Sequence, residues 1–211
     1  MDFTVINQRI LYCGKTGSGK SLLLRYMLDK YKHEFRKIYL ISPTERINNF
    51  YKGIVRDTDI FENYNESWMN LLIKKLTDYK QENDKSYGNV CVILDDVVAS
   101  ENLNNSKSLK TLLCRGRHIN ITVLITVQYI NLVSPVVRNN SSYIICGKQN
   151  KLSVDLLADY YISGNLSRSE FIKMFNENTN DYNFLIINCN NTKTDDVDEY
   201  FGTIKCPKEY I

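Results

Sequence analysis

Eight residues near the start of the chain, Gly14-Lys15-Thr16-Gly17-Ser18-Gly19-Lys20-Ser21, match the pattern G-x-x-x-x-G-K-[ST] at every fixed position. The apolar run Ile10–Cys13 precedes them and a helical pattern follows. This order predicts a strand, a tight loop and a helix, in which backbone N–H groups and the positive helix end surround phosphate oxygens. We expect Lys20 to reach the β- and γ-phosphates and Ser21 to hold Mg²⁺. The loop is therefore a predicted site for ATP and Mg²⁺.

Short apolar runs alternate with longer amphipathic segments along the chain, a pattern typical of an α/β fold. The expected strands are Arg9–Cys13, Lys37–Ser42, Val90–Leu94, Ile121–Val127, Tyr143–Cys146 and Asn183–Asn188. Three expected helices are Ser21–Tyr31, Leu152–Tyr161 and Ser167–Phe175. Two more are indicated by apolar stripes at helical spacing, one formed by Trp68, Leu72, Leu76 and Tyr79 and one by Leu109, Leu112 and Leu113, with Ser106 as the cap of the second. Several strands are apolar without alternation, as expected where helices cover both faces. We predict a P-loop NTPase, a three-layer sandwich around a mostly parallel sheet.

Composition sets the outer limits of this prediction. The 211 residues suit one domain, 1–211, and 43% of them are apolar, enough for a packed core. The net charge of +3 does not by itself indicate a nucleic-acid-binding protein. The six cysteines lack metal-ligand spacing, and the start of the chain lacks the pattern of a signal peptide, so we expect a reduced, intracellular protein.

A second set of candidate residues follows the apolar strand Val90–Leu94, which leads into the adjacent carboxylates Asp95 and Asp96. ATP hydrolysis needs one acidic group for the Mg²⁺ site and another to orient or deprotonate the attacking water. We assign Asp95 to magnesium and Asp96 to the water. A solvent-exposed Asp-Asp turn after a strand is the alternative interpretation.

Two further candidates flank the strand Ile121–Val127. Gln128 follows it, and a polar amide there can sense the γ-phosphate or position water. Upstream, the guanidinium groups of Arg115 and Arg117 can stabilise charge on phosphate oxygens, often from a neighbouring subunit. Taken alone, these arginines are equally consistent with a solvated helix C-terminus, where cations are favourable.

The order of these motifs resembles the HerA/FtsK superfamily of DNA-pumping ATPases, and within it the DNA-packaging ATPases of poxviruses and other large DNA viruses. In HerA- and FtsK-like proteins an arginine precedes the sensor glutamine by eleven positions, and Arg117 precedes Gln128 by the same interval. The pair Asp95-Asp96 is similar to the viral branch, where cellular relatives usually carry Asp-Glu. Pro135–Asn140, ahead of the Tyr143 strand, also resembles that branch. The chain departs from cellular members after the sensor strand, since it reads Gln128-Tyr129-Ile130 where they often read Gln-Arg-Pro.

This resemblance implies a RecA/HerA-FtsK-like sheet in which the Gln128 strand lies between the P-loop strand and the Asp95 strand. It also implies an ATP-hydrolysing translocase that forms a homo-oligomeric ring, a hexamer, around double-stranded DNA. Capsid or portal proteins are the further implied partners. The implied location is the virus assembly site in the host-cell cytoplasm, or the virion.

Other functions stay open at this point. A DNA helicase or conjugation-type ATPase shares the whole core. A GTPase-like switch would use Thr192–Asp195, which matches [NT]-K-x-D, but Asp95–Val98 lacks the D-x-x-G of GTPases. A nucleotide or shikimate-type kinase would need an Arg-rich lid. Candidate DNA contacts are Lys107, Lys110, Lys148 and Lys151, each of which also fits a solvated helix face.

Overall fold

The structure, a computed structural model, describes residues 3–83, 87–97, 103, 105–162, 166–190 and 196–211. Its centre is an eight-stranded sheet in the order β3-β2-β4-β5-β1-β6-β7-β8. The strands are β1 Arg9–Cys13, β2 Lys37–Ile41, β3 Ile60–Phe61, β4 Val90–Asp95, β5 Ile121–Val127, β6 Tyr143–Cys146, β7 Asn183–Asn188 and β8 Phe201–Lys205. From β3 to β6 neighbouring strands are parallel, and β7 pairs antiparallel with both β6 and β8.

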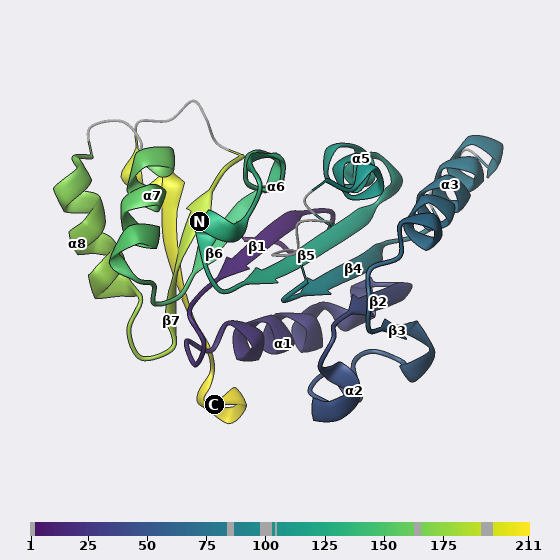
Figure 1. Ribbon diagram of the computed structural model, residues 1–211, viewed down its shortest axis with the longest axis horizontal. Coiled ribbons are helices and arrows are strands. Elements are labelled where there is room, and N and C mark those ends of the chain that lie inside the picture. Colours follow the sequence, from purple (N-terminus) through teal and green to yellow (C-terminus); the bar gives the residue numbers. More distant parts are fainter. Residues whose placement is uncertain (1–2, 84–86, 98–102, 104, 163–165, 191–195) are drawn as a thin grey trace.

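Helices cover both faces of this sheet, as the unbroken apolar strands require (Figure 1). They are α1 Lys20–Tyr31, α2 Glu45–Asn48, α3 Glu66–Asn83, α5 Lys107–Arg115, α6 Pro135–Asn140, α7 Lys151–Tyr161, α8 Arg168–Asn178 and α9 Val197–Tyr200. In Figure 1, α1 and α2 lie below the sheet, and α5, α6 and α7 lie above it. None of the helices in the described ranges is both long enough and apolar enough to cross a membrane.

Two buried clusters follow from this arrangement, one on each face of the sheet. On the face of α1, Leu23, Leu24 and Leu28 pack against Tyr12 and Phe184. On the other face, apolar residues of α3, α5, α7 and α8 pack against alternate residues of the strands. Because successive strand residues point to opposite faces, each central strand contributes to both clusters. The sheet is therefore held rigidly from both sides.

The fold predicted from sequence is confirmed. The sheet is mostly parallel and lies between two helical layers, and β5 lies between β1 and β4 as the resemblance implied. The predicted cap is also present, since the Ser106 hydroxyl accepts a hydrogen bond from the Leu109 N–H. The observed α3 and α8 end later than the predicted stripes, at Asn83 and Asn178.

Several short elements were not predicted. They are β3 with two residues, α2 and α9 with four each, α6 with six, and β8 with five. The first four are too short to show a period of their own. In β8, Gly202, Thr203 and Lys205 dilute the apolar pattern, because this strand lies at an edge of the sheet.

Candidate nucleotide-binding site

The candidate residues of the P-loop and of the two following strands meet at the carboxyl edge of the parallel strands. The P-loop follows β1, Asp95 ends β4 and Gln128 follows β5. Since β4, β5 and β1 are adjacent and parallel, their ends lie side by side. Ligands of open α/β sheets bind at this edge.

The P-loop is held in place by backbone hydrogen bonds to the neighbouring strand ends. The Gly14 N–H donates to the Val127 carbonyl (3.1 Å), and the Lys15 N–H donates to the Lys148 carbonyl (3.0 Å). Gly19 has φ +86°, a left-handed conformation that glycine adopts freely, and a Cβ there would come within 2.5 Å of the Tyr182 ring. The loop thus takes the sharp curve that brings it into the N-terminus of α1.

Lys20 extends from the first turn of α1 towards the paired aspartates. Its Nζ lies 3.3 Å from Oδ2 of Asp96, and its side chain is only 9% exposed, whereas that of Asp96 is 41% exposed. Asp96 also has φ +53°, a conformation that costs free energy for a residue other than glycine and is common at functional sites. The structure therefore brings the P-loop lysine and the proposed water-activating carboxylate together.

Asp95 lies deeper than Asp96 and is held by hydroxyl groups. The Thr126 hydroxyl donates to its Oδ1 (2.6 Å), and the Ser42 hydroxyl lies 3.5 Å from its Oδ2. Burial raises the pKa of Asp95, the Thr126 hydrogen bond opposes this rise, and the Asp96 charge adds to it. A cation beside Asp95 would compensate the cost of burying its charge.

Thr126 is a site residue that sequence reasoning missed. It lies opposite Asp95 in the β4–β5 register, is fully buried, and its hydroxyl accepts the Asp96 N–H (2.9 Å) while donating to Asp95. One hydroxyl thus fixes both aspartates. The available signal was a hydroxyl residue in the otherwise apolar end of the run Ile121–Val127.

Glu45 and Tyr51 were also missed. Glu45, only 3% exposed, accepts the N–H groups of Phe50 (3.1 Å) and Tyr51 (2.8 Å). Burial raises the pKa of Glu45, and these hydrogen bonds oppose the rise. Burial and the nearby Asp95 carboxylate raise the pKa of Tyr51 well above its usual value. No sequence signal marked Glu45, because a single acidic residue in a polar stretch is ordinarily exposed.

Gln128 is exposed at the end of β5 and lines a cavity of about 190 Å³ together with Asp96 and Thr126. Its carbonyl accepts a hydrogen bond from Nε2 of Gln149 (3.1 Å), a residue that follows β6. The structure therefore brings Gln128 and Asp96 to the same cavity.

Arg117 is not part of this cluster. It lies in the 3₁₀ turn Gly116–Ile119, which precedes β5, so it is at the opposite edge of the sheet from its own P-loop. β5 has seven residues, and at a rise of roughly 3.3 Å each the two edges are about 20 Å apart. Arg117 is exposed, and burial together with the Arg117 charge lowers the pKa of Arg9 at the start of β1. Arg117 therefore cannot reach its own nucleotide site. Arg115, at the end of α5, is also exposed.

The donor groups at the carboxyl edge fit ATP and Mg²⁺. A Cβ on Gly14 would collide with the Ser18 hydroxyl, so the loop accepts only glycine there without a shift. Mg²⁺ takes few protein ligands beside substrate phosphates and water, and the Ser21 hydroxyl and Asp95 are suited to it. In the described part of the chain, no group of three or more His, Cys, Asp or Glu forms a separate metal site. The segment Thr192–Asp195 lies outside the described residues.

Comparisons with known proteins show the family of this chain. Residues 4–199 match the profile of the poxvirus A32 protein family. Protein 015R of frog virus 3 (isolate Goorha) is 29% identical over 145 residues, which make up 69% of this chain and 45% of that protein. The chain thus spans less than half of that relative.

Solved structures share the fold. The genome packaging NTPase B204 of Sulfolobus turreted icosahedral virus 2, in complex with AMPPCP, superposes with a TM-score of 0.66 at 16% identity, covering 94% of this chain and 97% of that one. The pCW3 conjugation coupling protein TcpA superposes with a TM-score of 0.59 at 18% identity, covering 85% and 57%. At these identities the superpositions show the fold alone, whereas the profile match covers most of the chain and agrees with the viral branch expected from sequence. The chain belongs to the poxvirus A32 protein family.

Proposed function

We propose that this chain is an ATP-hydrolysing translocase that packages viral double-stranded DNA into the capsid, with residues 1–211 acting as one ATPase domain. The observation that carries the proposal is the contact between Lys20 and Asp96 beside Asp95, in a chain of the A32 family. The fold it shares with a viral genome packaging NTPase that was solved with AMPPCP supports the same function.

The chain's own residues divide the chemistry of hydrolysis among them. Lys20 exchanges its contact with Asp96 for the β- and γ-phosphates, which frees the Asp96 carboxylate to orient and deprotonate a water. Ser21 and Asp95 would hold Mg²⁺, and Thr126 fixes the position of Asp95. Bound Mg²⁺ supplies charge neutralisation at the phosphates. Gln128, beside Asp96, senses the γ-phosphate.

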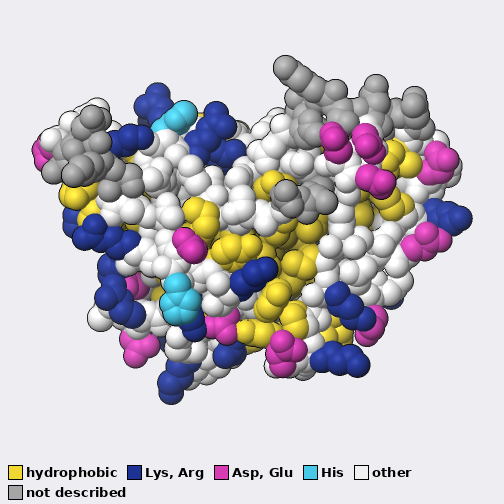
Figure 2. All heavy atoms as spheres, turned by 180° about the vertical axis from the view of Figure 1, so that it is seen from behind, with side chains coloured by type: hydrophobic (Ala, Val, Ile, Leu, Met, Phe, Trp, Pro, Cys, Tyr) yellow, Lys and Arg dark blue, Asp and Glu magenta, His cyan; other side chains and the backbone are white. Residues whose placement is uncertain are grey.

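The partners in this proposal are double-stranded DNA, like subunits in a hexameric ring, and capsid or portal proteins, at the virus assembly site or in the virion. Arg117 lies at the sheet edge opposite its own P-loop, which suits a residue that serves a neighbouring subunit. On the face in Figure 2, the described lysine and arginine side chains lie among acidic ones.

Two alternatives make different predictions. A helicase or conjugation-type ATPase would separate the strands of a forked duplex. A GTPase-like switch would bind GTP selectively and would not respond to DNA. We expect instead a preference for adenine over guanine nucleotides and activity on intact duplex.

The test is displacement of a third strand from a fully paired duplex that carries a triplex-forming oligonucleotide. We expect ATP-dependent displacement from a blunt duplex and no strand separation on a matched fork. Unwinding of the fork without triplex displacement would favour the helicase alternative. Selective GTP binding without a DNA response would contradict the proposal as a whole.

A further inference from the structure

A second cavity, of about 230 Å³, lies against the outer side of the P-loop. Its walls include Lys20, Ser21 and Leu22 from the start of α1, and the aromatic rings of Phe50 and Tyr182. A void of this volume holds several water molecules, so it has room for part of a ligand beside the P-loop. It is distinct from the cavity between Asp96 and Gln128.

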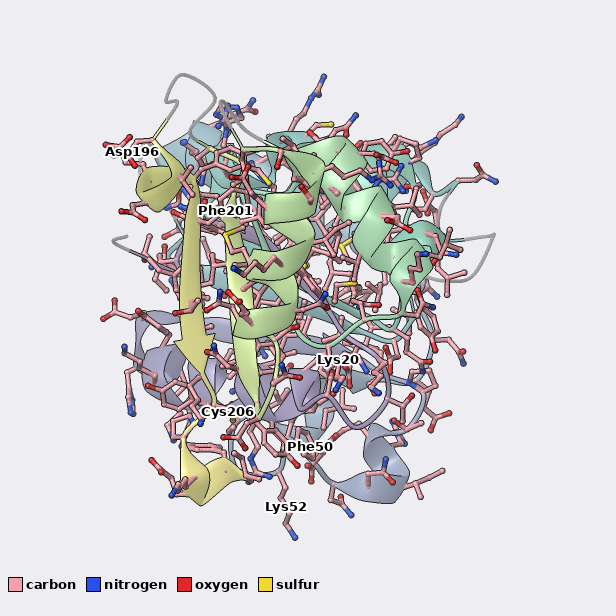
Figure 3. All side chains as sticks on the ribbon, turned by 90° about the vertical axis from the view of Figure 1, so that its left-hand side faces the viewer. Lys20, Phe50, Lys52, Asp196, Phe201 and Cys206 are labelled. Carbon is pink, nitrogen blue, oxygen red and sulfur yellow. The ribbon has the colours of Figure 1, made fainter. Side chains whose placement is uncertain are left out.

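This cavity lies where the base of a nucleotide bound to the P-loop is expected. Lys20 reaches the β- and γ-phosphates, and the N–H groups at the start of α1 face the phosphates nearer the sugar. A nucleotide held in this way would extend its sugar and base past Ser21 and Leu22, and both residues line the cavity. Figure 3 shows Lys20 and Phe50 at the same end of the molecule, whereas Asp196 lies at the other end.

Tyr182 is fixed against the P-loop itself. It precedes β7, its carbonyl accepts the Cys206 N–H (3.0 Å), and its ring touches the position that a Cβ of Gly19 would occupy. Its φ of +55° is unfavourable for a tyrosine. A half-buried aromatic residue that keeps this conformation at the edge of a cavity indicates that its ring position matters.

Phe50 is fixed from the opposite side by Glu45. The Glu45 carboxylate accepts the Phe50 N–H, the Tyr51 ring packs edge-on at 5.0 Å between ring centroids, and the Arg25 guanidinium lies 5.4 Å from the Phe50 ring centre. Glu45 also accepts the Tyr51 N–H, so one buried carboxylate positions the backbone of Phe50 and of Tyr51. Phe50 and Tyr182, which are far apart in the sequence, are thus both held in place beside the same cavity.

We propose that Phe50 and Tyr182 form the site that binds the purine base and sugar of the nucleotide, by stacking and apolar contact with the base. The inference rests on the proposed function, since it takes the P-loop to hold the triphosphate. Aromatic side chains bind bases through the π-face that every base presents. Glu45 is the positioning residue of this site, because it holds the backbone of Phe50.

The experiment compares a ligand that has a base with one that does not. Binding of ATP and of inorganic tripolyphosphate is measured by calorimetry for the parent protein, Phe50→Ala, Tyr182→Ala, Phe50→Tyr and Tyr182→Phe. We expect each alanine variant to weaken ATP binding by roughly tenfold or more and to leave tripolyphosphate binding unchanged. The aromatic replacements should bind ATP like the parent, and Tyr160→Ala, an exposed tyrosine on α7, is the matched control.

Three outcomes overturn the inference. ATP affinity that stays at the parent level in both alanine variants would show that the rings do not touch the base. Equal losses for ATP and tripolyphosphate would show that the rings only support the P-loop. A parent protein that binds neither ligand would contradict the proposed function, and the base site with it, whereas a parent that binds both keeps the two questions separate.

Discussion

At the scale of single residues, the two aspartates have different environments and hence different expected roles. Asp95 is half-buried and bonded to Thr126, whereas Asp96 is more exposed and contacts Lys20. A buried carboxylate with few free oxygen positions suits a fixed cation, and an accessible one suits a mobile water.

Asp96→Asn is therefore expected to bind ATP and Mg²⁺ but to hydrolyse ATP about 10²- to 10⁴-fold more slowly. Asp95→Asn should also raise the Mg²⁺ concentration needed for half-maximal turnover. Single-turnover hydrolysis against Mg²⁺ concentration measures both effects. Identical curves for the two variants would refute the division of roles.

The raised pKa of Asp95 also predicts that the free energy of unfolding depends on pH. Its pKa is raised in the folded state by burial, so the ionised form is less favourable there than in the unfolded chain. Asp95→Asn should therefore unfold at a higher denaturant concentration than the parent at pH 7. The difference between the unfolding midpoints of the two proteins should disappear as the pH falls below the ordinary aspartate pKa of about 3.9, because Asp95 is then neutral in both the folded and the unfolded state. Urea unfolding of both proteins across this pH range is the measurement. A difference in midpoint that grows on acidification would contradict a raised pKa for Asp95.

At the scale of elements, the sequence was sufficient wherever a pattern was long or locally complete. The P-loop was predictable because its motif is complete within eight residues. The strands β4 and β5 were predictable because each is a mostly apolar run with polar residues at its end, Asp95 and Asp96 at one and Gln128 at the other. Glu45, Thr126 and Phe50 were not, because their roles depend on contacts between segments far apart in sequence. The short α2 and β3 fell below the length at which a period is visible.

Substitutions at Thr126 test whether the pairing of β4 with β5 positions the two aspartates. Thr126→Val keeps the volume but leaves the Asp96 N–H without its acceptor, which should cost about 1–3 kcal/mol of unfolding free energy. Turnover should also fall, with a shift in Mg²⁺ dependence like that of Asp95→Asn. Thr126→Ser retains the hydroxyl and is the control. Parent-like turnover and Mg²⁺ dependence in Thr126→Val would show that the hydroxyl does not position Asp95.

At the scale of the whole molecule, catalysis by Arg117 requires an assembly of several subunits. Arg117 lies at the sheet edge opposite its own P-loop, so a catalytic role for it needs a second subunit. An arginine supplied by a neighbour is worth roughly 10³–10⁵ in turnover, whereas a surface arginine at a helix end contributes under about 1 kcal/mol of stability.

Arg117→Ala should accordingly fold and bind ATP normally but hydrolyse it at least about 10³-fold more slowly. Mixing it with Lys20→Ala protein should restore some turnover, because the latter subunits offer an intact Arg117 to a working P-loop. The rescue should depend on protein concentration and on DNA. Arg115→Ala is the matched control and should be milder. Slow hydrolysis that no mixture rescues would exclude the role between subunits.

Steady-state ATP turnover with and without duplex DNA tests whether the P-loop drives ATP hydrolysis in a DNA-dependent motor. The parent protein should hydrolyse ATP, and faster when duplex is present. Lys20→Ala should lose hydrolysis under both conditions together with most nucleotide affinity, whereas Lys30→Ala, an exposed lysine on the same helix but outside the P-loop, should retain activity. Near-parent turnover in Lys20→Ala would show that the P-loop is not the site of ATP hydrolysis.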